Sequence, residues 1–310
     1  MVLIDTSVQR LDRFTVVGTL MNILSRKTKK EDEYLSAVRF EIQHFLNESP
    51  RNAKKISIEN EEFRSRSQAM WTDIVELSFD EIESRIRTVE IPELTSLVRF
   101  LDLRSEGVIL SPIHMGEYLF AILAIVVAMP KRKVLILRRN AKRSERERRV
   151  FSKLAEFGVE YQVVRLDETA GIRVMQCLRN GGLVVMFMDL SGHFGKTLPL
   201  TVLGNTVRWV SGPAWFAKLT GAYVVSLVCY RSSGTSFCDI LRVEGGRRSK
   251  KLETSAIAQL LASSVEGYLR EYPAQWLHWL HLLEMFERPR VLELDPSNPH
   301  FQGRSTEGWI

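Results

Sequence analysis

The chain has 310 residues, of which 45% are hydrophobic and 26% are charged, and its formal net charge is +6. This composition is ordinary for a soluble globular protein and argues against an intrinsically disordered chain. No segment approaches the roughly 18 uninterrupted apolar residues of a membrane span, and the amino terminus lacks the pattern of a signal peptide. We expect a cytoplasmic protein, with peripheral contact to the inner membrane as an open alternative.

The first hundred residues have the apolar spacing of helices. This spacing covers residues 28–47 and 58–79, and Pro92 stands at the first turn of a third helical segment that reaches residue 103. These segments carry no set of residues that suggests catalysis. We therefore predict a helical amino-terminal region over residues 1–104, packed on the core as a scaffold or as cover for an acceptor.

From residue 107 onwards, strand patterns alternate with helical patterns. Strands are predicted over residues 108–110, 134–137, 161–164 and 183–188, and helices over residues 119–127, 144–157, 169–179 and 252–272. Residues 224–230 and 237–243 flank Ser232-Ser233-Gly234, which predicts an antiparallel hairpin. The alternation favours an α/β fold with a mostly parallel central sheet flanked by helices. We assign this core to residues 105–290 and a carboxyl-terminal tail to residues 291–310.

The candidate active site lies where the first strand of the core ends. The apolar run at residues 108–110 is followed by His114, Gly116 and Glu117 before the next helix begins. His114 is thereby expected in a strand-to-helix turn at the carboxyl end of the sheet, where open α/β sheets bind ligands. The positive end of the helix dipole favours a neutral imidazole there, and such a ring accepts a proton at pH 7. For a lone histidine, a structural role in the turn is the alternative.

Five sequence blocks, taken in order, carry a resemblance to a known superfamily. They are residues 109–118 around His114, Leu137-Arg138-Arg139-Asn140, residues 181–192 centred on Asp189, residues 203–222, and Tyr272-Pro273-Ala274-Gln275-Trp276. Together these blocks resemble the lysophospholipid acyltransferase-like superfamily, and within it the bacterial lipid A late acyltransferases and the mycobacterial phosphatidylinositol mannoside acyltransferase. The resemblance implies transfer of an acyl group from a thioester of an acyl carrier protein or of coenzyme A to a hydroxyl or an amine. It also implies that His114 is catalytic, and the reaction requires neither a bound cofactor nor a metal.

One departure from the family concerns the partner of the histidine. The family has Asp or Glu five residues after its histidine to orient the imidazole, whereas this chain has Leu119. Glu117 could turn back on His114 from the first helical turn, or it could bind an amine-bearing substrate. Asp189 ends the next core strand, and because neighbouring parallel strands lie about 4.8 Å apart, its carboxylate can approach the same pocket. Asp189 is therefore the better candidate on geometry.

Donor binding is predicted from amides and basic side chains. Candidates for holding the oxyanion or the donor are the backbone amide near Gly116 and the side chains of Arg138, Arg139 and Arg208. Residues 131–149 contain ten Lys or Arg against two Glu, a net charge of +8, so the remainder of the chain sums to −2. Within this segment the polyanion-binding candidates are Lys142, Arg143, Arg146 and Arg149.

Such a cationic segment fits several partners. An acidic acyl carrier protein, a coenzyme A thioester, an anionic membrane and a tRNA would each be attracted to it, and a solvated charged helix is the alternative. The leading hypothesis is a soluble acyltransferase with His114 as general base. A second hypothesis takes an aminoacyl-tRNA as co-substrate and passes its aminoacyl group to a small nucleophile in a biosynthetic pathway. A third, suggested by Leu119, is a non-catalytic relative that binds an acyl carrier or a lipid.

Overall fold

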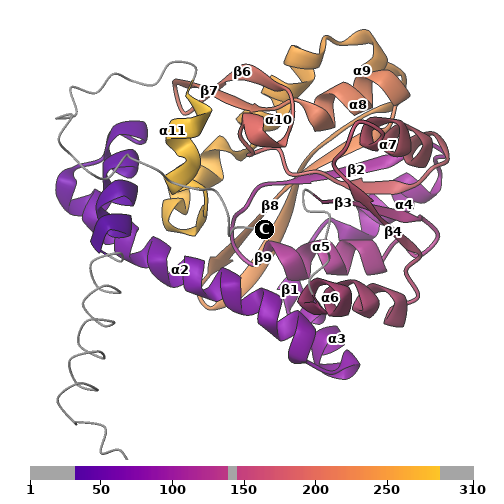
Figure 1. Ribbon diagram of the computed structural model, residues 1–310, viewed down its shortest axis with the longest axis horizontal. Helices are drawn as coiled ribbons and strands as arrows, with labels where there is room; N and C mark the ends of the chain where they lie inside the picture. Colours follow the sequence, from indigo (N-terminus) through magenta and orange to yellow (C-terminus); the bar gives the residue numbers. More distant parts are fainter. Residues whose placement is uncertain (1–31, 139–144, 287–310) are drawn as a thin grey trace, which may run out of the picture.

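The computed structural model describes residues 32–138 and 145–286 of the chain. In this part of the chain, a mostly parallel central sheet is flanked by helices, which confirms the predicted α/β fold (Figure 1). The sheet has seven strands in the order β1-β9-β8-β2-β5-β3-β4, and its described strands are parallel except for the β8–β9 pair. The described helices include none that is long and apolar enough to cross a membrane.

The elements have the following bounds. The strands of the large sheet are β1 (Val89–Glu90), β2 (Val108–Pro112), β3 (Val134–Arg138), β4 (Tyr161–Arg165), β5 (Leu183–Val185), β8 (Tyr223–Ser232) and β9 (Thr235–Glu244), and a separate hairpin consists of β6 (Thr197–Val202) and β7 (Asn205–Val210). The α-helices are α2 (Pro50–Glu76), α3 (Phe79–Arg87), α4 (Leu94–Asp102), α5 (Tyr118–Val127), α6 (Glu145–Glu156), α7 (Ala170–Arg179), α8 (Gly212–Thr220), α9 (Gly246–Lys251), α10 (Thr254–Glu271) and α11 (Leu282–Met285), and residues 32–45 are also helical. Three short 3-10 turns are η1 (Gly192–Phe194), η2 (Pro273–Gln275) and η3 (Trp279–His281).

Strand β2 is the centre of the sheet because its sequence is apolar on both faces. All five of its residues are buried, and it pairs in parallel with β5 on one side and with β8 on the other. Successive side chains of a strand point to opposite faces, so Ile109 belongs to one hydrophobic core while Val108 and Leu110 belong to the other. Helix α5, which is apolar nearly all round, covers the second of these cores.

The amino-terminal helices contribute to the same two cores. Ile42 and Ile56 belong to the same hydrophobic core as Ile109, and Met70 and Leu101 belong to the same core as Val108. Figure 1 shows α2 as a long helix that crosses one side of the molecule beside η2 and α6. Apolar side chains before and after residue 104 are thus buried together.

Helix α2 begins at Pro50, earlier than the apolar spacing predicts. The hydroxyl of Ser49 accepts a hydrogen bond from the amide of Asn52 at 3.2 Å, and proline at the first helical position needs no intrahelical donor. The cap at Ser49 therefore lets the helix begin in a polar stretch, where the spacing of apolar residues does not predict a helix.

The hairpin of β6 and β7 and the two-residue strand β1 were not predicted. Pro199 lies inside β6 and argues locally against a strand, while Leu203 and Gly204 form the tight turn with φ values of 53° and 80°. Strand β5 is shorter than predicted and ends at Val185, although the amides of Met186 and Met188 still donate to the carbonyls of Leu110 and Pro112. The chain therefore continues alongside β2 as far as Asp189.

Candidate active site

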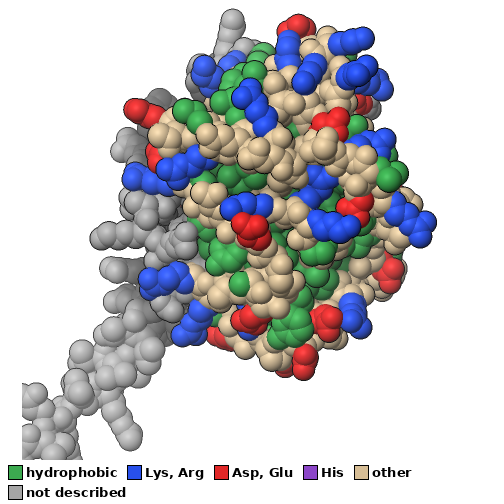
Figure 2. Space-filling view, turned by 90° about the vertical axis from the view of Figure 1, so that its right-hand side faces the viewer, with side chains coloured by type: hydrophobic (Ala, Val, Ile, Leu, Met, Phe, Trp, Pro, Cys, Tyr) green, Lys and Arg blue, Asp and Glu red, His purple; other side chains and the backbone are tan. Residues whose placement is uncertain are grey.

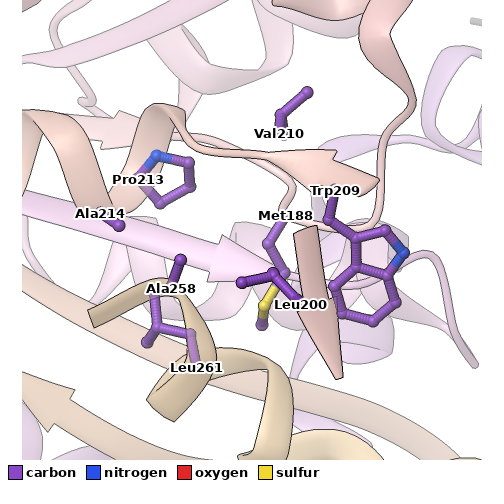
Figure 3. A pocket seen from close by; sticks show the side chains of 8 residues that line it. All are labelled: Met188, Leu200, Trp209, Val210, Pro213, Ala214, Ala258 and Leu261. Atoms are coloured by element: carbon purple, nitrogen blue, oxygen red, sulfur yellow. The ribbon is translucent and has the colours of Figure 1, made fainter. Parts of the chain in front are cut away.

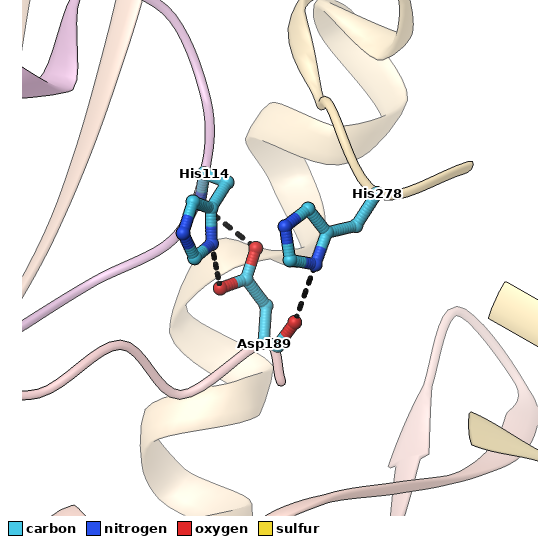
Figure 4. A group of neighbouring side chains, drawn as sticks. All are labelled: His114, Asp189 and His278. Carbon is cyan, nitrogen blue, oxygen red and sulfur yellow. Dashed lines mark hydrogen bonds and ion pairs between the residues drawn. The ribbon is translucent and has the colours of Figure 1, made fainter. Parts of the chain in front are cut away.

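His114 lies in the turn between β2 and α5, at the carboxyl end of the central strand. Its backbone amide donates to Oδ2 of Asp189 at 2.8 Å, and its ring Nδ1 lies 2.9 Å from Oδ1 of the same carboxylate (Figure 4). Asp189 follows β5, the parallel neighbour of β2. The two contacts fix both the loop and the plane of the imidazole.

Asp189 is fully buried and accepts three hydrogen bonds. The third donor is Nε1 of Trp276, 2.9 Å from Oδ2. Burial alone would raise the pKa of Asp189, but the imidazoles of His114 and His278 and the hydrogen bonds from His114 and Trp276 bring that pKa well below its usual range. An ionised carboxylate only accepts hydrogen bonds, so Nδ1 of His114 carries the hydrogen. In the neutral ring, Nε2 then keeps the lone pair that a general base needs.

Two aromatic rings hold the imidazole of His114 between them. Phe187 stacks on it with ring centroids 3.9 Å apart at 21°, and His278 stacks on it at 4.1 Å and 16°. The side chain of His114 keeps 17% of its surface exposed, whereas that of Asp189 has none. The imidazole of His114 is therefore held between two rings and still reachable from outside.

His278 is hydrogen-bonded to the backbone of the same aspartate. Its Nδ1 lies 2.9 Å from the backbone carbonyl oxygen of Asp189, and because a carbonyl only accepts, Nδ1 of His278 is the donor (Figure 4). Burial, together with the neighbouring His114, lowers the pKa of His278 to about 3. His278 is thus a neutral ring whose Nε2 carries a lone pair.

The segment that carries Trp276 and His278 is tied to the His114 loop. The amide of Leu277 donates to the carbonyl of His114 at 2.9 Å, and the amide of Gly116 donates to the carbonyl of Gln275 at 3.3 Å. From the opposite side, the buried amide of Asn60 in α2 donates to the carbonyls of Ala274 and Trp276 at 2.9 and 2.8 Å. The loop after β2, the segment after α10 and helix α2 are distant in the sequence and are brought together around His114.

Gly116 has a structural role at this loop. Its φ is +60°, and a Cβ added there would lie 2.4 Å from the carbonyl oxygen of Cys229 in β8. Its amide already donates to Gln275, so it is occupied in this arrangement and the predicted oxyanion role gains no support from it. The glycine lets the loop pass closely over β8.

Glu117 contacts other partners than His114. Its carboxylate lies 2.9 Å from a guanidinium nitrogen of Arg85 and 3.7 Å from one of Arg231, and it accepts a 2.5 Å hydrogen bond from the hydroxyl of Ser236. These contacts connect the start of α5 with α3, β8 and β9. The structure therefore brings Asp189, and not Glu117, into hydrogen-bond contact with His114.

A comparison with protein families supplies the class of the molecule. Residues 15–283 match the family described as bacterial lipid A biosynthesis acyltransferase. This chain belongs to that family. The match confirms the resemblance expected from the five sequence blocks, and no curated protein sequence matches the chain.

The predicted donor-side residues of this acyltransferase family member are only partly described. Arg139, Lys142 and Arg143 lie outside the described residues, as do the side chains of Arg138 at the end of β3 and Arg146 in α6. Arg149 is exposed on α6, and Arg208 in β7 donates to the hydroxyl of Thr197 at 3.1 Å. Their roles in donor or polyanion binding stay predictions.

Basic side chains are also found away from these candidates. Figure 2 shows one face of the molecule, on which Lys and Arg side chains alternate with Asp and Glu and gather towards the end that holds α9. The last turn of α9 contains Arg248, Lys250 and Lys251. Because α9 follows β9, which runs antiparallel to β8, it lies at the edge of the sheet opposite His114.

A small apolar cavity lies behind the His114–Asp189 pair. It is lined by Met188, Leu200, Trp209, Val210, Pro213, Ala214, Ala258 and Leu261 (Figure 3). Met188 directly precedes Asp189, and the ring of Trp209 lies 6.4 Å from that of Trp276. The cavity volume is about 10 Å³, which accommodates at most one water molecule. An acyl chain would need the cavity to widen.

The two histidines and Asp189 also have the residue types of metal ligands. A ligand atom from each lies within 4.8 Å of the other two. Stacked imidazoles, however, direct their in-plane lone pairs side by side and not towards one point, and both oxygens of Asp189 already accept N–H groups. The arrangement suits an oriented base better than a shared ion.

Sequence reasoning missed two residues of this site. His278 was given no role by the sequence, and Phe187 was expected only as part of the strand over residues 183–188. Trp276 belongs to the last of the five sequence blocks but was given no role of its own. The position of His278 two residues after that block was the one available signal, and its approach to His114 depends on long-range packing of the segment after α10.

Proposed function

We propose that this chain is an acyltransferase that moves an acyl group from an activated ester or thioester to a hydroxyl or an amine, with His114 as general base. An acidic acyl carrier protein or coenzyme A would carry the acyl group. The observation that carries the proposal is the hydrogen-bonded pair of His114 and the buried, ionised Asp189 at the carboxyl end of the sheet. Membership in an acyltransferase family supports the reaction class.

In the proposed reaction, Nε2 of His114 removes a proton from the acceptor as the acceptor attacks the thioester carbonyl. The resulting imidazolium is stabilised by Asp189, as in other base and carboxylate pairs. The tetrahedral intermediate then expels the thiolate, which His114 protonates. Arg138, at the end of β3 on the same edge of the sheet, is the donor that we propose for the oxyanion.

The contact with Asp189 also bears on the non-catalytic alternative. That alternative was suggested by Leu119, which stands in α5 where the family has an acid. Asp189 approaches the histidine from a different strand and supplies the carboxylate that Leu119 lacks. This contact supports a catalytic role for the chain over that of a non-catalytic relative.

The proposal is tested by offering the full-length chain a panel of donors. Acyl carrier protein thioesters, acyl-coenzyme A and aminoacyl-tRNA are each incubated with mixed hydroxyl and amine acceptors, and new esters or amides are identified by mass spectrometry. We expect product with wild type and with His44→Ala, whose histidine is exposed and contacts the carbonyl of Phe40 in its own helix, and none with His114→Ala. Equal product from His114→Ala would refute the proposal.

The aminoacyl-tRNA hypothesis keeps the chemistry and changes the donor. It is favoured by the net charge of +8 in residues 131–149 and by the exposure of Arg148 and Arg149 on α6. Binding of tRNA would weaken steeply with salt and would be lost when Arg148 and Arg149 are changed to Glu. The same change at Arg247 and Arg248, at the opposite edge of the sheet, is the matched control. Absence of tRNA binding at low salt eliminates this hypothesis.

A further inference from the structure

The imidazole of His114 is enclosed between two flat rings. The centroid of Phe187 lies 3.9 Å from that of His114 with the ring planes at 21°, and the centroid of His278 lies 4.1 Å away with the planes at 16°. Two rings that are so close and so nearly parallel to the imidazole cannot share one of its faces without overlapping, so they cover opposite faces. Asp189 contacts Nδ1 in the plane of the ring. An acceptor therefore approaches Nε2 in the ring plane.

Phe187 comes from the same segment as the carboxylate. It lies two residues before Asp189, in the stretch that continues alongside β2 through backbone hydrogen bonds. Tyr118, the first residue of α5, packs edge to face with both Phe187 and His114, with ring centroids 5.4 Å apart in each pair and planes at 87° and 72°. The ring of Phe187 is thus fixed against the imidazole by contacts on two sides.

This close stacking suits one protonation state of the imidazole better than the other. Two neutral aromatic rings prefer an offset or edge-to-face arrangement with centroids about 4.5–7 Å apart, because their faces carry partial charges of the same sign. A cation within about 6 Å of a ring centroid is instead attracted to the face of that ring. The imidazolium that forms when His114 takes a proton is such a cation, so the contact with Phe187 strengthens as the proton arrives.

We propose that Phe187 is a positioning residue that favours the protonated ring of His114 in the transition state of acyl transfer, while His278 covers the opposite face. This inference rests on the proposed function and adds a residue to it. A contact that strengthens as the proton moves lowers the barrier, whereas a contact of equal strength before and after the step does not. Asp189 stabilises the imidazolium in the ring plane, and Phe187 does so at the ring face.

The other titratable groups at the ring do not interfere with a test of this role. Among the described residues, the titratable side chains in contact with His114 are Asp189, His278 and Tyr118. Burial and the neighbouring His114 lower the pKa of His278 to about 3, and burial raises the pKa of Tyr118 to about 12. The pKa of Asp189 lies well below its usual range. A titration around neutral pH therefore reports on His114 itself.

The proposal is tested first on the ring resonances of His114, without turnover. Full-length protein labelled with 15N in its histidines is titrated with acid, and the signal of His114 is identified by its loss in His114→Asn. Phe187→Leu keeps an apolar side chain and removes the π face. We expect the midpoint of the titration to fall by about one pH unit in this variant, because a cation–π contact screened from water is worth about tenfold.

Further variants separate the π face from packing. Phe187→Tyr keeps the face and should retain the wild-type midpoint. Phe157→Leu removes another half-buried ring, which packs on Phe79 with centroids 4.4 Å apart, and it should leave the midpoint unchanged. If Phe187→Leu does not fold, Phe187→Met, which also lacks a ring, is measured in its place.

The same shift is expected in the kinetics with the donor that the panel identifies. In Phe187→Leu the acid limb of kcat/KM should move to lower pH by about one unit. On the plateau, kcat should fall about three- to tenfold, because a weaker base takes the proton less readily, and KM should stay within about twofold of wild type. A ring that serves packing alone would lower kcat without moving the acid limb.

The outcomes distinguish this inference from the proposed function. An unchanged midpoint in folded Phe187→Leu, or an equal shift in Phe157→Leu, overturns the role of Phe187 and leaves the acyltransferase proposal standing. A lower midpoint without any transfer that depends on His114 refutes the proposed function, and the inference falls with it. A lower midpoint together with slower, His114-dependent transfer supports both.

Discussion

At position 189 the chain buries an ionised carboxylate and surrounds it with three N–H donors, two from His114 and one from Trp276. A buried charge is costly unless it is hydrogen-bonded, and here one of the hydrogen bonds also fixes the tautomer of the imidazole. Glu117 is also a carboxylate of the same loop region, but its ion pair with Arg85 turns it towards α3. In the proposed reaction, the orienting acid is therefore Asp189, which faces the ring, and not Glu117.

Substitution of the two acids tests this distinction. Asp189→Asn removes the charge that stabilises the imidazolium and the preference for hydrogen on Nδ1, and we expect kcat to fall about 10³- to 10⁴-fold. Glu117→Gln should stay within about tenfold of wild type, because its carboxylate contacts no reacting group. Steady-state kinetics on both variants, with circular dichroism to verify the fold, measures the difference. A larger loss in Glu117→Gln would assign the role to Glu117.

His278 gives the protein a predicted sensitivity to acid. Its pKa is about 3 in the folded chain and about 6.5 in an unfolded one. Between these values the unfolded state binds more protons, so the free energy of unfolding decreases as the pH falls through this window. The lowered pKa of Asp189 adds a second loss of stability, but only below about pH 4, where its unfolded carboxyl begins to take up protons.

The variant His278→Phe keeps a ring on His114 and removes the titrating nitrogen. We expect its melting temperature to decline less than that of wild type between pH 7 and about pH 4.5, where the histidine dominates. Thermal denaturation across this range is the measurement. Parallel curves for the two proteins would show that His278 does not titrate as described.

At the scale of elements, helix α2 holds the segment that closes the site. Asn60 is fully buried and donates to two carbonyls of that segment, at Ala274 and Trp276. Asn60→Ala leaves both carbonyls without their donor, and we expect a loss of about 2–5 kcal/mol in the free energy of unfolding. Ser57→Ala is the matched control, because the buried hydroxyl of Ser57 bonds within its own helix. Denaturant titrations with equal losses for both variants would contradict this role of α2.

The loop between β2 and α5 depends on Gly116. Gly116→Ala places a Cβ against the carbonyl of Cys229 and forces a side chain into positive φ, so we expect a loss of about 3 kcal/mol or more. Gly158 has a similar φ of +71° but no atom within 4 Å of the added Cβ. Gly158→Ala should therefore cost about 1 kcal/mol. Similar denaturation midpoints for the two variants would show that the close approach to β8 is unimportant.

Elements with continuous apolar runs were predictable, because their signal is local. The strand at Val108 and the helix that covers it were expected within a few residues of their observed bounds. Strand β6 contains Pro199, and strand β1 has two residues, so neither has a period long enough to detect. Capping by Ser49 likewise lengthened α2 beyond its apolar pattern.

At the scale of the whole molecule, the site could be predicted in part. The approach of Asp189 to His114 follows from the rule that parallel neighbours share an edge of the sheet. The approach of His278 does not follow from any local pattern, because it depends on how the segment after α10 folds back over β2. The described residues do not test whether the basic segment over residues 131–149 binds the donor, so this stays a prediction.

The shared cores have a consequence for the whole chain. Residues on both sides of position 104, such as Ile42 with Ile109 and Leu101 with Val108, are buried together. A chain that begins at residue 105 would expose this apolar surface, and we expect it to lack a cooperative unfolding transition. Thermal denaturation followed by circular dichroism tests this, and a cooperative transition near that of the full chain would contradict it.

The central claim is that the imidazole of His114 moves the proton in acyl transfer. The most direct measurement is kcat/KM for product formation by His114→Asn and by wild type, with the donor that the panel identifies and with matched melting temperatures. A positioned general base contributes about 10²- to 10⁴-fold, so we predict a loss of at least about 100-fold in the variant. Equal rates in a folded variant would contradict the account.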